Sequence, residues 1–139
     1  MQKKINSLEN RKESYKTSKN VLLSFKYAFS GIYYVLKTSK NFKIQLIFAL
    51  TSLMFGFLLQ ISLSDYVILI ATIISVLILE VLNTSIESIV DLLMKKEFNR
   101  LAKISKDTSA GAVLLASINS VIIALYIFIP KIKLLFLNL

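Results

Sequence analysis

Four polar side chains share one face of an otherwise apolar segment near the middle of this sequence. They are Glu80, Asn83, Glu87 and Asp91, at spacings of three, four and four residues. At about 100° per residue of an α-helix, the four side chains fall within about 80° of one another. Three carboxylates on one stripe repel each other unless a cation neutralises them, so the pattern favours a cation or phosphate site. The alternative is a polar contact between packed helices.

A second polar group, made of Lys103, Lys106 and Asp107, comes just before another apolar run. Asp107 is predicted to be the N-cap of a helix that begins at residue 108. Free N–H groups and the positive dipole end at such a helix start bind phosphate, and Lys106 adds a positive charge. The alternative is that Lys106 is a solvated loop residue. Residues 109–112 (Ser-Ala-Gly-Ala) predict a smooth helix surface that a neighbour approaches closely.

Three long apolar runs predict helices that cross a membrane. They are residues 44–63, residues 66–93 and residues 108–129, and the only charged side chains in them are the three stripe carboxylates. Twenty helical residues rise about 30 Å, which is the thickness of bilayer hydrocarbon. The chain has 139 residues, of which 55% are hydrophobic, with only three Gly and one Pro. This composition predicts one all-α integral membrane domain over residues 20–139.

The first 40 residues have a different character. Residues 1–19 are rich in lysine and without periodicity, which predicts a flexible basic tail in the cytosol. Residues 20–40 repeat apolar side chains every three or four positions, with lysines at the ends and on the other side. This pattern predicts an amphipathic helix in the membrane interface. A core-facing helix of a soluble bundle is the alternative, but the rest of the chain offers no soluble core.

Basic residues set the expected orientation of the chain. Its 17 Lys and Arg exceed its 8 acidic residues, for a net charge of +9, and most precede residue 44 or lie between 94 and 107. We attribute them to anionic lipid and membrane topology, with no nucleic acid partner. The positive-inside rule then places the N-terminus and the 94–107 loop in the cytosol and residues 64–65 outside. Cys and His are absent, which excludes disulfides, thiol nucleophiles and histidine acid–base chemistry.

The two polar motifs resemble the prokaryotic diacylglycerol kinase family, and within it the Gram-positive undecaprenol kinase branch. Residues 80–91 fit the pattern E-[IV]-[LV]-N-[ST]-[AS]-I-E-x-x-x-D. Residues 102–114 fit A-K-x-x-K-D-x-x-A-[AG]-A-V-L, and the resemblance runs from about residue 20 to residue 132. There is no Gly-rich phosphate loop, so a nucleotide is expected to bind without that cradle.

The resemblance implies an enzyme of the bacterial cell membrane that transfers the γ-phosphate of MgATP to a lipid alcohol. Undecaprenol is the expected acceptor, and diacylglycerol is the alternative. By resemblance Glu80 is the general base and meets the lipid hydroxyl, Asn41 also contacts the lipid, and Glu87 binds Mg²⁺. The residues assigned to the nucleotide in this way are Lys19, Asn83, Asp91, Phe98, Lys106 and Asp107.

The resemblance also implies a homotrimer. We expect each active site to lie between two protomers, because three helices of about 30 Å are too short to cover the stripe that contains Glu80 within one chain.

Two positions near the first apolar run depart from the family pattern. Ser39 stands where the family has a second metal-binding Glu, and Gln45 stands where it usually has His. Mg²⁺ prefers carboxylate and phosphate oxygens to a neutral hydroxyl, so we expect weaker metal binding at Ser39. The alternatives to an active kinase are therefore a weak or silent homologue that works as a membrane binding protein, and a small cation transporter. A transporter would need polar residues on the other helices, and the other two apolar runs contain few of them.

Overall fold

All the regular secondary structure in the described part of the chain is α-helix. The computed structural model describes residues 21–95 and 97–137. Within these ranges the helices are α2 (Val21–Thr38), α3 (Lys40–Leu58), α4 (Leu63–Met94) and α5 (Arg100–Leu137). Contacts divide the chain into two units between residues 34 and 35, and the candidate site lies wholly in the second unit. The predicted tail, residues 1–19, lies outside the described ranges.

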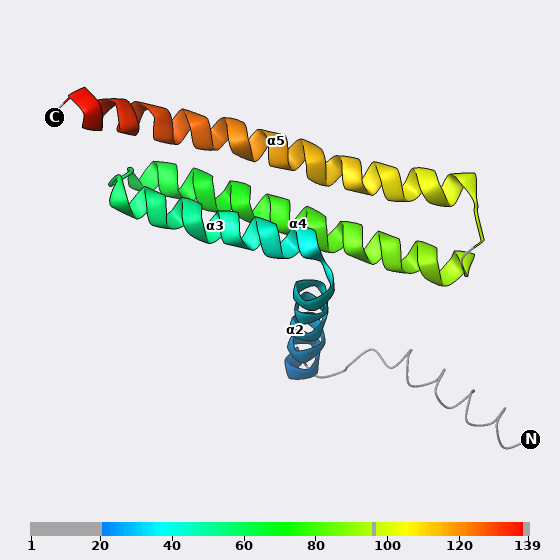
Figure 1. The fold of residues 1–139 in the computed structure, drawn as a ribbon. Helices are drawn as coiled ribbons and strands as arrows, with labels where there is room; N and C mark the ends of the chain where they lie inside the picture. The colour runs from blue at the N-terminus through cyan, green and yellow to red at the C-terminus, as the bar shows by residue number, and fades with distance from the viewer. Residues whose placement is uncertain (1–20, 96, 138–139) are drawn as a thin grey trace, which may run out of the picture. The chain divides into compact units, whose positions relative to one another are not determined.

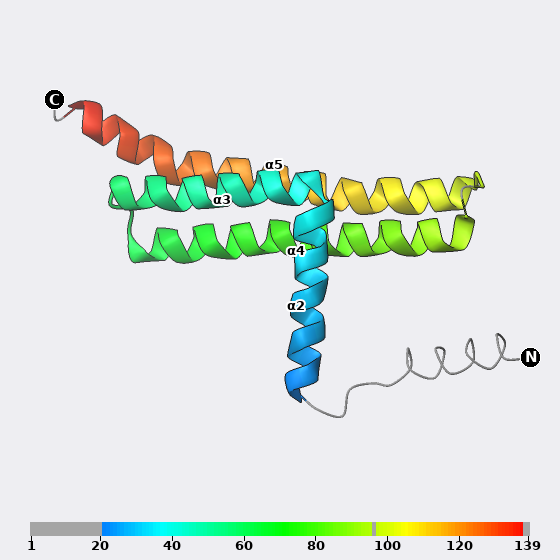
Figure 2. The ribbon, with the colours of Figure 1, turned by 60° about the horizontal axis from the view of Figure 1, so that its bottom comes forward.

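Three helices are long and apolar enough to cross a membrane, with 19 residues in α3, 32 in α4 and 38 in α5. At about 1.5 Å per residue, α3 matches about 30 Å of hydrocarbon, and α4 and α5 exceed it. Figures 1 and 2 show the three helices side by side, with α4 next to both α3 and α5. The prediction of an all-α membrane protein with three spanning helices after an N-terminal helix is confirmed.

Serine side chains cap the starts of α3 and α4, and the α3–α4 hairpin turns earlier than the apolar runs predicted. Ser39 caps α3, because its Oγ accepts a hydrogen bond from Phe42 N at 3.1 Å. Ser62 caps α4 in a capping box with Asp65, so residues 63–66 form the first turn of α4. The apolar runs placed the connection at residues 64–65, and this position is wrong, since a reciprocal cap satisfies the free N–H groups of a helix that begins at Leu63.

The start of α5 also corrects the sequence-based prediction. α5 begins at Arg100, two turns before Asp107, so Asp107 is not an N-cap. Asn99 takes that role, because its Oδ1 accepts hydrogen bonds from Leu101 N at 2.8 Å and Ala102 N at 3.2 Å. The free N–H groups of this helix start therefore lie away from Lys106. At the other end α5 continues through Pro130, which membrane helices tolerate.

Tight packing at the α3–α4 turn holds α3 in place beside α4 and α5. Buried Ile61 and Leu69 pack with Ile127 of α5. The rings of Phe55 and Phe128 meet edge to face with centroids 6.5 Å apart. Because α3 is fixed at this end, its other end is directed to the middle of α4, where Glu80 lies.

Candidate active site

Glu80 is covered within a single chain. The residue is only 2% exposed. Ser39 Oγ donates a hydrogen bond to Glu80 Oε1 at 2.7 Å, and Gln45 Nε2 donates one to Oε2 at 3.2 Å. A buried carboxylate requires such partners, because an unpaired one costs several kcal/mol. Glu80 itself is therefore covered by the beginning of α3, whereas the expected homotrimer with each active site between two protomers stays a prediction.

Asn83 connects α5 to the next carboxylate of the stripe. Asn83 is 6% exposed. Its Nδ2 donates to Glu87 Oε1 at 3.2 Å, and its Oδ1 lies 2.6 Å from Ser109 Oγ of α5, which also lies 2.9 Å from Lys106 O. Both ends of the amide are thus engaged, so the Glu87 side chain is held from α5 through Asn83.

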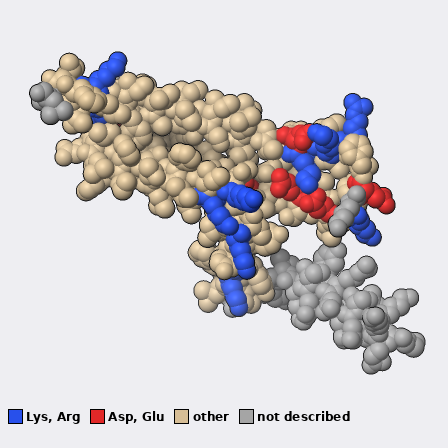
Figure 3. Space-filling model, viewed as in Figure 1, with Lys and Arg blue, Asp and Glu red and all other residues tan. Residues whose placement is uncertain are grey.

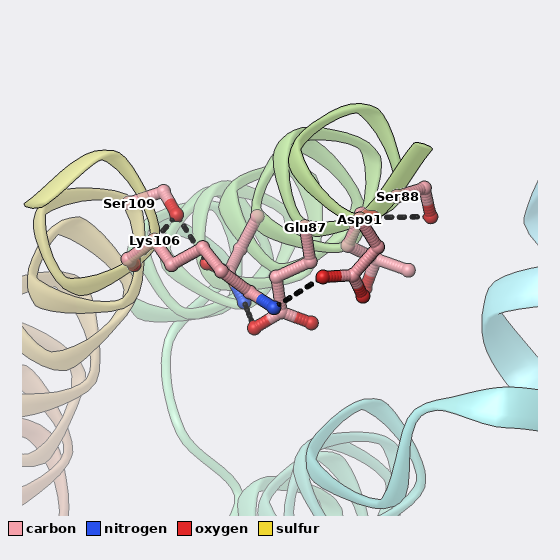
Figure 4. A network of polar contacts seen from close by, with 7 residues as sticks. Glu87, Ser88, Asp91, Lys106 and Ser109 are labelled. Carbon is pink, nitrogen blue, oxygen red and sulfur yellow. Dashed lines mark hydrogen bonds and ion pairs between the residues drawn. The ribbon is translucent and has the colours of Figure 1, made fainter. Parts of the chain in front are cut away.

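The stripe becomes progressively more open towards the C-terminal end of α4. Lys106 Nζ of α5 donates to Asp91 Oδ1 at 2.7 Å, and the two side chains are 36% and 69% exposed. Figure 4 shows the ammonium group of Lys106 and the carboxyl groups of Glu87 and Asp91 turned towards one another between α4 and α5. This end therefore combines one cation with two carboxylates and is accessible to a charged ligand from water.

Three predicted site residues lie apart from these contacts, and a fourth is not described. Asp107 forms an ion pair with Lys103 in which both side chains are more than 60% exposed. Phe98, in the α4–α5 connection, is 83% exposed. Asn41 is exposed in the first turn of α3. Lys19 lies outside the described residues.

Two residues of the site were not assigned a role from the sequence. Gln45 was noted only as a departure from a family pattern, and Ser109 only as a small residue. A Gln inside an apolar membrane helix is a usable signal, because its amide requires hydrogen-bond partners there. Ser109 follows Lys106 by three residues, which places both on one face of α5.

The donor set fits a metal that arrives with a nucleotide. The described residues include no group of three or more His, Cys, Asp or Glu that could hold a metal ion. Glu87 is half-buried and uses Oε1 to accept from Asn83. Mg²⁺ keeps several waters and is commonly bound by one or two carboxylates together with phosphate oxygens. Glu87 is thus suited to serve as a protein ligand of Mg²⁺ bound to ATP.

An apolar groove of about 420 Å³ runs between α3, α4 and α5 and has Gln45 in its lining. The hydroxyls of Thr72, Ser117 and Ser120, also in the lining, donate to carbonyls of their own helices. Gln45 Oε1 is buried and has no partner. The groove is therefore suited to a hydrocarbon chain, and its polar lining includes the residue that bonds Glu80.

Charge is unevenly distributed over this unit. On the face drawn in Figure 3, acidic side chains and several basic ones gather where α4 connects to α5. The surface over the middle of α5 carries no charge in this view. The charged end and the apolar groove together provide a polar ligand and a lipid with separate approaches to α4.

The sequence profile of the prokaryotic diacylglycerol kinase family matches residues 26–128. A protein of Synechocystis sp. named diacylglycerol kinase is 39% identical over 120 residues, which cover 86% of this chain and 69% of the relative. A protein of Bacillus subtilis named undecaprenol kinase is 41% identical over 108 residues, which cover 78% of this chain and 87% of the relative.

Proposed function

The chain belongs to the prokaryotic diacylglycerol kinase family and is a lipid kinase, and we propose that it transfers the γ-phosphate of MgATP to undecaprenol. The polar stripe on a membrane-spanning helix is consistent with membership of this kinase family. The proposal adds the acceptor and the residue roles, which follow from the contacts described above.

Glu80 is the observation that carries the proposal. It is a buried carboxylate about 26 Å along α4 from Leu63, at about 1.5 Å per residue, and an acid at such a depth is costly without a function. Each of its oxygens retains a lone pair beyond the bonds to Ser39 and Gln45. Glu80 takes the proton of the lipid hydroxyl as the new oxygen–phosphorus bond forms. The bond from the γ-phosphorus to ADP breaks, and the proton later leaves to water.

The open end of the stripe receives the nucleotide. Lys106 contributes the positive charge for the phosphates and is now held by Asp91. Glu87, oriented by Asn83, serves as the ligand of Mg²⁺, which supplies charge neutralisation on the phosphates when it is bound. These residues position the phosphates, which is most of what phosphoryl transfer requires of a protein.

The groove favours undecaprenol over diacylglycerol as the acceptor. A chain lying in the groove ends near Gln45, so its terminal hydroxyl comes close to Glu80. An isoprenoid alcohol has the hydroxyl as its only polar group, whereas diacylglycerol also has two ester groups. The hydroxyls of Thr72, Ser117 and Ser120 already donate to the backbone, so esters gain no donor from these three and only Ser52 adds a further hydroxyl to the lining. The relative named undecaprenol kinase supports the same choice, and the relative named diacylglycerol kinase makes that lipid the second candidate.

The test is a kinase assay on purified protein in lipid vesicles with ATP, Mg²⁺ and either undecaprenol or diacylglycerol. We expect phosphorylation of undecaprenol at the higher kcat/KM. Glu80→Gln should lower turnover by about 10² or more, the usual effect of losing a general base, and should still bind ATP. Glu97→Gln, which changes an exposed acid in the α4–α5 connection, is the matched control and should keep wild-type turnover. A preference for diacylglycerol would contradict the acceptor, and no turnover with either lipid would favour the silent homologue.

A further inference from the structure

Glu80 is held by two uncharged donors that reach its two oxygens separately. Ser39 Oγ donates to Oε1 at 2.7 Å and Gln45 Nε2 donates to Oε2 at 3.2 Å. A single hydrogen bond would leave the terminal torsion of a Glu side chain broad. Two bonds, one to each oxygen, restrict the carboxylate to one plane. Both donors lie within or directly before α3, so the orientation of the carboxylate depends on this helix.

The Ser39 hydroxyl is itself held in one direction. Phe42 N donates to Ser39 Oγ at 3.1 Å, and Ser39 N donates to Val35 O at 2.8 Å. The cap therefore uses a lone pair of Oγ and leaves its proton for Glu80. The residue that starts α3 thus also fixes one oxygen of the buried carboxylate.

The hydrogen bond to Glu80 determines the orientation of the Gln45 amide, although this orientation leaves the amide oxygen without a donor. Its Oε1 is buried and has no partner, which is an unfavourable state for a carbonyl. Turning the amide over would bring Oε1 against Glu80 Oε2 and lose the hydrogen bond. The observed orientation therefore favours the contact with Glu80.

We propose that Ser39 and Gln45 are positioning residues that direct the free lone pairs of Glu80 towards the acceptor hydroxyl. The inference rests on the proposed role of Glu80 as the general base. It gives Ser39 a role that does not involve metal. Because both residues act through Glu80, removing either donor lowers kcat and leaves the KM for ATP unchanged.

The experiment measures kcat and the KM for ATP with the lipid acceptor for Ser39→Ala, Ser39→Thr and Gln45→Met. We expect kcat to fall about 10-fold or more in the Ala and Met variants, since misplacing a reacting group by about 1 Å costs up to about 10²-fold. Ser39→Thr keeps the hydroxyl and the cap and should retain most of the kcat. Ser62→Ala is the matched control, because it removes the corresponding N-cap of α4 without touching Glu80. It should lose the stability that a cap supplies, less than Ser39→Ala loses because that variant also removes a donor from buried Glu80, and should keep the wild-type kcat.

A second measurement places Ser39→Ala in the Glu80→Gln background, where it should cause no further loss of kcat. An additive loss there would overturn the inference, as would a wild-type kcat in Ser39→Ala. An equal fall of kcat in Ser62→Ala would assign the effect to capping and overturn it too. A wild-type protein that phosphorylates no lipid alcohol would overturn the proposed function, and this inference with it.

Discussion

Ser39 contacts Glu80 from the position at which the family pattern has a second metal-binding Glu. In this chain a hydroxyl donates to Glu80 instead. Two carboxylates at that distance repel each other unless they share a proton or a cation. A neutral donor removes that requirement, so the contact is stable without metal. The weaker metal binding expected from Ser39 stays a prediction.

At the residue scale we predict that Ser39→Glu makes the protein depend more strongly on Mg²⁺. The new carboxylate lies beside Glu80, and a divalent cation relieves the repulsion between them. The Mg²⁺ concentration for half-maximal turnover should fall, and Mg²⁺ should raise the thermal stability of the variant more than that of wild type. Ser39→Gln is the control, because Gln has the same size as Glu but carries no charge. An unchanged Mg²⁺ midpoint would show that residue 39 does not face the metal.

At the element scale, the close approach of α3 and α4 depends on Gly56. A Cβ at this position would lie 2.9 Å from Ile61 Cδ1 and 3.2 Å from the Tyr66 ring. Ile61 is buried in the core that joins three helices, so it has little room to move. The absence of a side chain at Gly56 therefore allows the hairpin to turn within Leu59–Ser62.

We predict that Gly56→Ala lowers the stability of the folded protein in detergent. Overpacking costs about 1–3 kcal/mol, which exceeds the gain of about 1 kcal/mol from better helix propensity. Gly111→Ala is the control, because a Cβ added there has no neighbouring atom of the described residues within 4 Å. Adding Ile61→Val removes Cδ1 and should restore part of the loss. Thermal unfolding reports all three variants, and a Gly56→Ala as stable as Gly111→Ala would contradict the packing argument.

At the scale of the whole molecule, the distribution of basic residues determines the expected orientation. Residues 94–107 contain five Lys and Arg, whereas the α3–α4 connection at residues 59–62 contains none. The positive-inside rule therefore predicts a cytosolic α4–α5 connection and a cytosolic N-terminus.

The chain has no Cys, so single cysteines can report this orientation directly. We predict that Ser64→Cys, exposed at the start of α4, reacts with a membrane-impermeant maleimide in intact cells. Ser105→Cys, exposed near the start of α5, should react only after the membrane is opened. The wild-type protein is the unreactive control. The opposite labelling pattern would reverse the proposed topology.

The oligomeric state is the second prediction at this scale. Glu80 does not need a neighbour, but the end of the stripe proposed to bind the nucleotide is open, with Asp91 69% and Lys106 36% exposed. Phosphoryl transfer to a lipid is favoured where water is excluded, so we predict that a second protomer closes this end in a homotrimer. Native mass spectrometry in mild detergent, paired with turnover on the same sample, tests this. A monomer that turns over ATP would contradict it.

The features that depend on local pattern could be predicted from the order of the amino acids alone. Long apolar runs predicted the three spanning helices, because hydrocarbon accepts few polar side chains. The helical repeat placed Glu80, Asn83, Glu87 and Asp91 on one face before any fold was known. The two motifs in residues 80–91 and 102–114 indicated the family, which the comparisons confirm.

The side chains that meet across helices could be identified only once the helices were packed together. Ser39 and Gln45 lie 41 and 35 residues from Glu80, and Ser109 lies 26 residues from Asn83. The periodicity of one helix does not report how a neighbouring helix is rotated. The spacing of residues therefore did not indicate which donors face Glu80 and Asn83. The starts of α4 and α5, capped by Ser62 and Asn99, differ from the predicted starts for a related reason. A cap depends on backbone geometry that hydrophobic pattern alone does not encode.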